Sequence, residues 1–419
     1  MRARRFFYVF LALCIIVCGA VTVYRAAFNS IERTDFTVYV AAGRAVLENH
    51  DIYLAENARG WRYVYPPPFA ILLAPLARMP LGAGALLWYL LTVAAIGGSV
   101  AMSAALLGAS PLRSKPQIVY GLPLLGLASL LISGMLRSQA SPFMYFFMVA
   151  AFYFHLKNRP AAAGFSLACA VLLKVFPLVL LAYFVLRRQW RAVLATAGAL
   201  VLLGIVLPSL YWGWQFNLDQ IARWIDVVGH PAIMENAERA QKSSLYSQLL
   251  NAAKPRNQSL EALFLSLGMP AYLTHYAVAA SAAAMLAAMW ASMRRIPFRR
   301  VPQVDQATPR TVESTAESLL CGAFICWSLM ISPIAESHYF GALLLPLTVV
   351  VGCADRNPRR KARYLAAGTA IMLVVLVLTA LDVTAVWRSL CIATLALWLL
   401  CMRLIGSPQQ EIAADQRQR

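Results

Sequence analysis

Apolar runs recur along this chain from one end to the other, separated by polar segments. Many runs approach the length that an α-helix needs to cross the hydrocarbon core of a bilayer, about 20 residues. A backbone inside a bilayer must pair its own N–H and C=O groups, so runs of this length predict helices. We therefore predict an all-α polytopic membrane protein. On the criterion of about 20 residues for each pass, the chain has about twelve transmembrane helices, over residues 6–23, 83–107, 117–135, 142–156, 160–173, 175–186, 192–210, 271–292, 318–333, 338–353, 364–382 and 387–403.

Charge is distributed unevenly between the two sides that these spans define. The chain is 60% hydrophobic and 13% charged, yet its net charge is +19, whereas soluble proteins carry about 25% charged residues. With the N-terminus in the cytoplasm, 23 of the 37 Lys and Arg and six of the 18 Asp and Glu fall in cytoplasmic segments. The balance is therefore +17 inside and +2 outside, an asymmetry that orients membrane proteins. Nucleic acid is not needed as a partner to explain the charge.

This pattern predicts one integral domain over residues 1–419, in the cell inner (plasma) membrane, with a cytoplasmic tail over 404–419. Two extracytoplasmic segments, 24–82 and 211–270, exceed the roughly 15 residues of ordinary connections. In the first segment, apolar residues follow Thr34 and Asp35 at helical spacing: Phe36, Tyr39, Val40, Gly43, Val46 and Leu47. We expect a short amphipathic helix on the membrane surface, with Thr34 or Asp35 as its N-cap.

Proline punctuates several of these segments. The run from Tyr65 through three prolines to Pro68 predicts a rigid extended segment. Pro177, Pro333 and Pro346 predict kinks or breaks in their spans. The eight cysteines lie in or beside apolar runs, and none has metal-ligand spacing with a histidine. We therefore predict buried apolar cysteines and no metal site.

Asp35 and Lys174 are the first candidates for chemistry. Asp35 follows the first span near the outer interface, where a carboxylate whose pKa is raised by burial can act as a general base. The competing interpretation is a helix cap. Lys174 interrupts an apolar run near the outer face, and ionisable residues at such depth are often functional. Its alternative role is an interfacial anchor whose amine reaches toward water.

Further candidates lie on the same side of the predicted membrane. The segment 332–340 contains Glu336 and His338, which suit phosphate binding or proton transfer, or which belong to a polar hairpin that only reverses the chain. Arg62, Arg137 and Gln139 add hydrogen-bond donors, and arginine matches the oxygens of phosphate. Asn257-Gln258-Ser259 formally matches a glycosylation acceptor. The grouping of these residues on one side favours a functional site over scattered structural residues.

Several motifs together resemble glycosyltransferase family 87. They are Asp35-Phe36-Thr37-Val38-Tyr39, Asp51-Ile52-Tyr53, Tyr65-Pro66-Pro67-Pro68-Phe69, Gln139, Leu173-Lys174-Val175-Phe176-Pro177, Arg187-Arg188-Gln189-Trp190-Arg191, Asn257-Gln258-Ser259-Leu260 and Ser332-Pro333 through His338. The resemblance runs from about residue 30 to residue 350. It implies a GT-C-type fold, with short amphipathic helices on the extracytoplasmic side.

The resemblance also implies a reaction. Such enzymes move a sugar, most often mannose, from a polyprenyl-phosphate donor to a hydroxyl of a lipid-linked or polymeric glycan, with inversion. It assigns Asp35 as the general base and places His338 near the donor phosphate or the acceptor. Lys174, Arg62, Gln139, Arg137 and Glu336 become expected phosphate or sugar contacts. The expected partners are membrane lipid, the donor and a glycan acceptor, without a cofactor, and the chain has no glycine-rich nucleotide loop.

Three other functions remain open at this point. A secondary transporter would also be polytopic, but it would carry ionisable residues near the bilayer midplane. A ligase for lipid-linked glycans would share the outer groove and use a pyrophosphate carrier. A membrane scaffold would need no Asp35.

Overall fold

The computed structural model describes residues 2–29, 34–106, 120–229, 256–296, 312–354, 368–375, 377–378 and 388–417. In chain order the named elements are α1 (Arg2–Ala27), α2 (Asp35–Leu47), η1 (Ile52–Leu54), α3 (Pro67–Ala77), α4 (Leu81–Ala105), α5 (Leu122–Gly126), α6 (Ala128–Leu136), α7 (Ser141–Leu156), α8 (Pro160–Leu173), η4 (Phe176–Leu180), α9 (Leu181–Leu186), α10 (Trp190–Val201), η5 (Leu202–Val206), α11 (Leu207–Trp212), α12 (Trp214–Trp224), η6 (Ile225–Gly229), α15 (Leu260–Ser266), α16 (Ala271–Arg295), α17 (Val312–Ile331), η8 (Ser337–Leu343), α18 (Leu344–Ala354) and α21 (Ser389–Arg417). Within these ranges no β-strand forms, so the all-α prediction is confirmed for them.

Four helices are both long and apolar enough to cross a bilayer: Arg5–Ala27, Leu81–Ala105, Trp190–Trp212 and Ala271–Arg295. Of seven shorter apolar helices between Pro67 and Ile405, six fall where further spans are predicted, and the seventh, Pro67–Ala77, lies in the first predicted outer segment. The count of twelve spans is therefore not confirmed. Within the predicted span 364–382, the structure describes only residues 368–375 and 377–378. The longest runs face outward: only 11% of the most apolar stretch of α1 is buried, as expected for a helix that contacts lipid.

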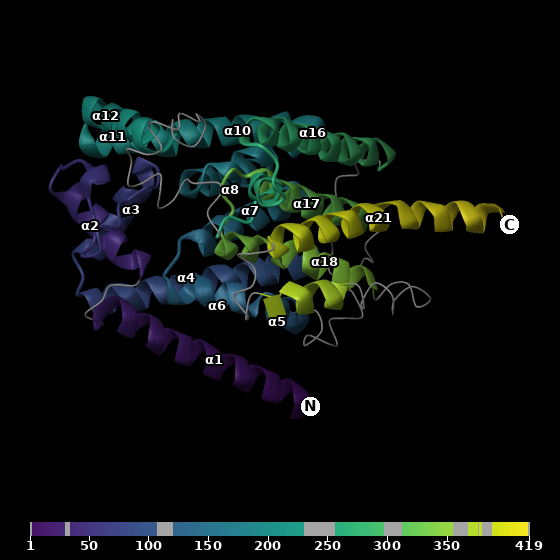
Figure 1. Ribbon diagram of the computed structural model, residues 1–419, viewed down its shortest axis with the longest axis horizontal. Coiled ribbons are helices and arrows are strands. Elements are labelled where there is room, and N and C mark those ends of the chain that lie inside the picture. Colours follow the sequence, from purple (N-terminus) through teal and green to yellow (C-terminus); the bar gives the residue numbers. More distant parts are fainter. Residues whose placement is uncertain are drawn as a thin grey trace.

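Two groups of elements lie side by side at one end of the molecule (Figure 1). They are α2 and α3 from the first predicted outer segment, and α11 and α12, which include the end of the apolar helix Trp190–Trp212 and the start of the second predicted segment. Hydrogen bonds join them: Trp212 Nε1 donates to the Val46 carbonyl, and Trp224 Nε1 donates to the Val64 carbonyl. The backbone N–H of Ile52 donates to Gln220 Oε1 at 3.1 Å. The described helices α2, α3, α11 and α12 therefore form one cap at this end of the helix bundle.

The predicted helix after Thr34 is present as α2, but its expected position on a surface is wrong. Nine of its 13 residues are buried, including Phe36 and Tyr39. The reason is close packing against α3. A Cβ on Gly43 would lie 2.7 Å from the Leu73 carbonyl oxygen, so only glycine permits this approach.

The extended proline segment is also shorter than predicted. Pro66 has extended backbone angles, but Pro67 and Pro68 are the first two residues of α3. Proline suits these positions because the first helical N–H groups have no partner within the helix. Pro177 lies in the 3₁₀ turn η4, and Pro333 follows the end of α17, so both mark breaks as predicted.

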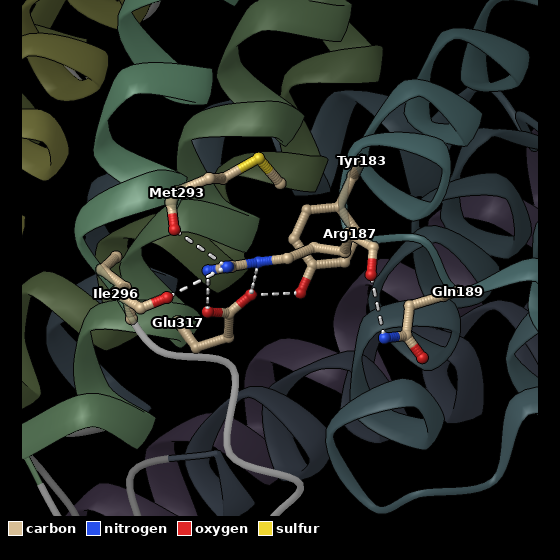
Figure 2. A network of polar contacts seen from close by, with 6 residues as sticks. All are labelled: Tyr183, Arg187, Gln189, Met293, Ile296 and Glu317. Atoms are coloured by element: carbon tan, nitrogen blue, oxygen red, sulfur yellow. Dashed lines mark hydrogen bonds and ion pairs between the residues drawn. The ribbon is translucent and has the colours of Figure 1, made fainter.

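A buried ion pair joins helices α9, α16 and α17, away from the cap (Figure 2). Arg187 contacts the Glu317 carboxylate through Nε and Nη2, and its Nη1 donates to the carbonyls of Met293 and Ile296. The hydroxyl of Tyr183 donates to Glu317 Oε1 at 2.5 Å. The side chains of Arg187 and Glu317 are 7% and 6% exposed. Both charges are therefore compensated inside the protein.

Breaking this pair should destabilise the protein strongly. We expect Glu317→Gln to lower the free energy of unfolding by about 3–5 kcal/mol, because it leaves a buried guanidinium without its counter-ion. Thermal unfolding of the purified protein in detergent measures this change.

The exposed pair of Arg62 and Glu56, 3.5 Å apart, supplies a matched control. Glu56→Gln should change the unfolding free energy by less than about 1 kcal/mol, because water screens an exposed pair. Equal effects of the two substitutions would show that the buried pair has no special structural weight.

Candidate active site

The Asp35 carboxylate is held at the first turn of α2 by the segment that joins α6 to α7. The backbone N–H of Asp35 donates to the Arg137 carbonyl at 2.9 Å, and Gln139 Nε2 donates to Asp35 Oδ2 at 2.6 Å. Ser138, between these two partners, has a φ of 55°, which turns the chain so that Gln139 points back toward α2. Thr34 occupies the N-cap position, but its side chain makes no capping hydrogen bond. A sequence-distant glutamine therefore orients the Asp35 carboxylate.

The surroundings of Asp35 favour its protonated form more than water does. Burial, reinforced by the nearby Glu336 carboxylate, raises the pKa of Asp35 to about 7. Lys174, the Gln139 hydrogen bond and Arg137 act in the opposite direction and lower this pKa. A carboxyl group with a pKa near neutrality can both take and release a proton under physiological conditions.

Lys174 lies where helix α8 stops and the chain becomes extended, with φ −153° and ψ 131°. Its Nζ donates to the Tyr339 hydroxyl at 2.6 Å and lies 5.4 Å from the centroid of the Tyr65 ring. The Phe176 ring stacks on Tyr339 at 5.6 Å and fixes its plane. Burial lowers the pKa of Lys174 to about 8, while Glu336 and Asp35 oppose this change. The negative charges of Glu336 and Asp35 therefore favour the charged form of this amine, and burial opposes it.

Glu336 lies at the end of the turn between α17 and η8, and His338 is the second residue of η8. Glu336 Oε2 lies 3.5 Å from His338 Nδ1, and the side chains are 20% and 2% exposed. Within the described part of the chain, neither ring nitrogen of His338 has a hydrogen-bond partner. Buried polar atoms usually have partners, so this imidazole retains unused capacity to contact another group.

Three tyrosines of the cap segment, Tyr39, Tyr53 and Tyr65, are linked by hydrogen bonds close to these polar groups. The hydroxyls of Tyr39 and Tyr65 lie 3.0 Å apart, and the Ala140 N–H donates to the Tyr39 oxygen. The Tyr53 hydroxyl donates to the Tyr65 carbonyl at 3.0 Å. Burial raises the pKa of Tyr65, so this hydroxyl remains protonated at neutral pH. These contacts fix the position of the Tyr65 ring, whose face lies toward the Lys174 ammonium.

The structure brings most of the predicted residues together. Asp35, Gln139, Lys174, Glu336 and His338 form one cluster, which we name the acid–lysine cluster, and Arg137 contributes its carbonyl and a nearby positive charge. Arg62 lies elsewhere in a half-exposed pair with Glu56, and no described contact joins it to the cluster.

Sequence reasoning missed two aromatic contributors. Tyr339 and Tyr65 both contact the Lys174 ammonium. The sequence placed Tyr339 next to His338 and Tyr65 directly before the three prolines, and these positions could have indicated a role in the site. A tyrosine in an apolar run is, however, usually a core residue.

The glycosylation motif is ruled out by burial. Asn257 is 2% exposed, and its side-chain amide donates to the Pro333 carbonyl at 2.8 Å. Seven cysteines are described as free, and four of them are buried, as predicted for apolar residues. Among the described residues, no group of three His, Cys, Asp or Glu side chains is arranged to hold a metal ion.

These features define a polytopic membrane protein with a partly buried acid–cation site next to the cap. Residues 63–333 match the model of glycosyltransferase family 87. The match covers more than half of the chain, so the protein belongs to this family and is a glycosyltransferase.

Two relatives resemble nearly the whole chain. A protein of Mycolicibacterium smegmatis is 23% identical over 415 residues, covering 89% of this chain and 83% of the relative. One of Mycobacterium tuberculosis is 25% identical over 402 residues, covering 89% and 84%. Both are named polyprenol-phosphate-mannose-dependent alpha-(1-2)-phosphatidylinositol mannoside mannosyltransferase. Among solved structures, ArnT from Cupriavidus metallidurans, bound to undecaprenyl phosphate, is similar with a TM-score of 0.42 and 15% identity, covering 96% of this chain and 77% of ArnT.

Gln139 should tune the protonation of Asp35. Because the Gln139 hydrogen bond lowers the pKa of Asp35, Gln139→Leu should raise it. Dicyclohexylcarbodiimide reacts with protonated carboxyl groups, so labelling of Asp35 should fall as pH rises through about 7, and should persist to higher pH in the variant. Peptide mass spectrometry measures the labelled fraction.

Gln215 is a matched control, because its Nε2 donates to the exposed Asp219 at 3.1 Å. Gln215→Leu should leave the labelling of Asp35 unchanged. A Gln139→Leu profile identical to that of the unmodified protein would contradict the orienting role of Gln139.

Proposed function

We propose that this glycosyltransferase moves a hexose, mannose above all, from a polyprenyl-phosphate donor to a hydroxyl of a lipid-linked or polymeric glycan. The observation that carries the proposal is the Asp35 carboxylate, which is partly buried near Lys174 and hydrogen-bonded to Gln139, and whose pKa is near neutrality. The named donors of the two mycobacterial relatives support a polyprenyl-phosphate sugar.

In the proposed reaction, the acceptor oxygen attacks the anomeric carbon of the sugar while Asp35 takes the proton of that hydroxyl. The bond from the anomeric carbon to the phosphate oxygen breaks, and its electron pair leaves with the polyprenyl phosphate. The single displacement inverts the anomeric configuration. Lys174 stabilises the negative charge of the phosphate, since an ammonium in a water-poor site interacts strongly with an anion.

Glu336 and His338 complete the proposed site. Glu336 raises the pKa of Asp35, which keeps the general base close to the operating pH. His338 has ring nitrogens available for a phosphate oxygen or a sugar hydroxyl. Arg137 adds positive charge toward Asp35, and Arg62 remains a proposed contact for a substrate that extends over the cap.

We also place the site on the extracytoplasmic face of the inner membrane, with the N-terminus in the cytoplasm. The charge balance of +17 and +2 on the two sides of the predicted topology supports this orientation. A membrane-impermeant thiol reagent applied to intact cells should react with Glu48→Cys, a position exposed on the cap, and not with Arg295→Cys. The reverse pattern would overturn the orientation.

Removing the proposed base should nearly abolish transfer. We expect Asp35→Asn to reduce kcat by a factor on the order of 10²–10⁴, the usual contribution of a general base. The assay uses purified protein in nanodiscs, a panel of undecaprenyl-phosphate and undecaprenyl-pyrophosphate sugars, and phosphatidylinositol mannoside as the acceptor.

Asp51→Asn is the matched control, because Asp51 lies in the same cap and its Oδ1 accepts the Tyr53 N–H, a bond that asparagine retains. This variant should transfer at the rate of the unmodified enzyme. Full activity of a folded Asp35→Asn would refute the base assignment. Transfer from pyrophosphate donors alone would favour the glycan ligase.

Activity should depend on pH through both charged groups. The rate should fall as pH drops through about 7, because Asp35 with its raised pKa becomes protonated. It should fall again as pH rises through about 8, where Lys174 with its lowered pKa loses its charge. We expect a narrow bell-shaped profile of kcat/KM.

Lys174→Arg separates the two limbs, since arginine stays charged throughout this range. The alkaline limb should disappear, and the acid limb should remain. An alkaline limb unchanged in this variant would exclude Lys174 as its cause.

A further inference from the structure

A network of buried hydrogen bonds surrounds the turn that carries Glu336 and His338. Asn257 Nδ2 donates to the Pro333 carbonyl at 2.8 Å, and Asn257 Oδ1 accepts the Ala335 N–H at 2.9 Å. The Gln258 N–H donates to the Ala335 carbonyl at 2.8 Å. The segment Asn257-Gln258 therefore forms hydrogen bonds with the backbone groups of Pro333 and Ala335 in this turn.

The start of α21 closes the network from the other side. Arg388 Nη1 donates to the Asn257 carbonyl at 2.9 Å, and the Leu390 N–H donates to Gln258 Oε1. Asn257, Gln258 and Arg388 are each at most 5% exposed. We name these three residues the turn clamp.

The clamp contacts three backbone groups of the turn: the Pro333 carbonyl, and the N–H and carbonyl of Ala335. Asn257 uses both ends of its amide on backbone groups of the turn, and backbone hydrogen bonds inside an apolar interior are strong and directional. The turn ends at Glu336, directly before η8. His338, in the first turn of η8, has its Nδ1 3.5 Å from Glu336 Oε2. A shift of the turn would move both side chains relative to Asp35.

We infer that Asn257 and Arg388 are positioning residues, which hold the 333–336 turn so that Glu336 and His338 face Asp35 and Lys174. This inference rests on the proposed function of the acid–lysine cluster and deepens it. It assigns a role to α21, which begins beyond the residues matched to the family, 63–333. None of the clamp residues touches the reacting groups in this role.

The first test reads the position of the turn without any activity. An ideal Cβ on Gly134 lies 3.7 Å from the Cβ of His338, within the range of about 3.5–4.5 Å that a disulfide spans. The pair Gly134→Cys and His338→Cys should therefore cross-link on oxidation with copper phenanthroline. Mass spectrometry of the linked peptides distinguishes this bond from those of the native cysteines.

Releasing the clamp should slow this cross-link. We expect Asn257→Ala, and separately Arg388→Met, to reduce the rate by about tenfold, as expected when a buried hydrogen bond that holds one conformation is lost. Asn217→Ala is the matched control, because Asn217 also has a buried side-chain amide. Its Nδ2 donates to the Ile205 carbonyl and the Ser209 hydroxyl, and none of these residues belongs to the turn or to the clamp. This variant should leave the rate unchanged. Arg388→Met, which leaves the Asn257 side chain in place, remains usable if the Asn257→Ala protein fails to fold.

The second test separates positioning from general stability. In mannosyl transfer from undecaprenyl-phosphate mannose, Asn257→Ala should lower kcat/KM by about 100-fold, the cost of a misplacement near 1 Å. In a His338→Ala background the same substitution should have much less effect, because residues that act through one another are not additive.

The outcomes separate this inference from the proposed function. Cross-linking that proceeds at the unmodified rate in both clamp variants would overturn the inference, whatever the enzyme transfers. Fully additive losses in the double variant would also overturn it. Activity retained by Asp35→Asn would instead refute the base assignment and leave the cross-linking result to decide the clamp.

Discussion

The charge compensation between the partly buried side chains of Asp35, Glu336 and Lys174 is the constraint on which the site depends. A single carboxylate or ammonium among apolar helices would lose its hydration without replacement, at a large cost in free energy. Here one ammonium lies near two carboxylates, and the competition between burial and attraction brings the pKa of Asp35 to about 7 and that of Lys174 to about 8. The attraction between these groups offsets the cost of removing their charges from water, and it also leaves both pKa values near physiological pH, where each group can exchange a proton. Each of the three residues lies at a helix end or a break, where the chain can present a polar side chain inward.

The second buried charge pair illustrates a different solution. The Arg187 guanidinium donates to Glu317 and to two backbone carbonyls, and Glu317 also accepts a hydrogen bond from the Tyr183 hydroxyl. That pair has its hydrogen-bonding groups engaged by neighbouring helices, which suits a structural role. Lys174 instead has one hydrogen bond in the described structure, to Tyr339, and otherwise rests against aromatic rings. An ammonium with three donors retains capacity for an anionic ligand. Hydrogen-bond satisfaction, rather than burial alone, therefore distinguishes the two sites.

Much of the helical layout could be predicted because it depends on local hydrophobic runs. The runs behind α4, α8 and α16 begin and end within a few residues of the predicted limits. Three expectations that depended on the packing of neighbouring elements failed. Helix α2 was expected at a surface, but α3 covers it. The prolines after Tyr65 start a helix because the following apolar residues continue it. Arg62 lies apart from the cluster, because the isolated bridge between Glu56 and Arg62 keeps it on the surface of the cap.

By itself, the sequence determined the class of protein, the places where helices form and the candidate residues Asp35, Lys174, Glu336 and His338. These follow from hydropathy, from the position of each ionisable group in an apolar run and from short motifs. Only the tertiary structure decided which groups meet. Gln139 reaches Asp35 across 104 positions, Tyr339 reaches Lys174 across 165, and Arg388 reaches Asn257 across 131. Such contacts arise when helices pack and their broken ends converge, and no local pattern encodes them, because each partner taken singly has an ordinary structural explanation.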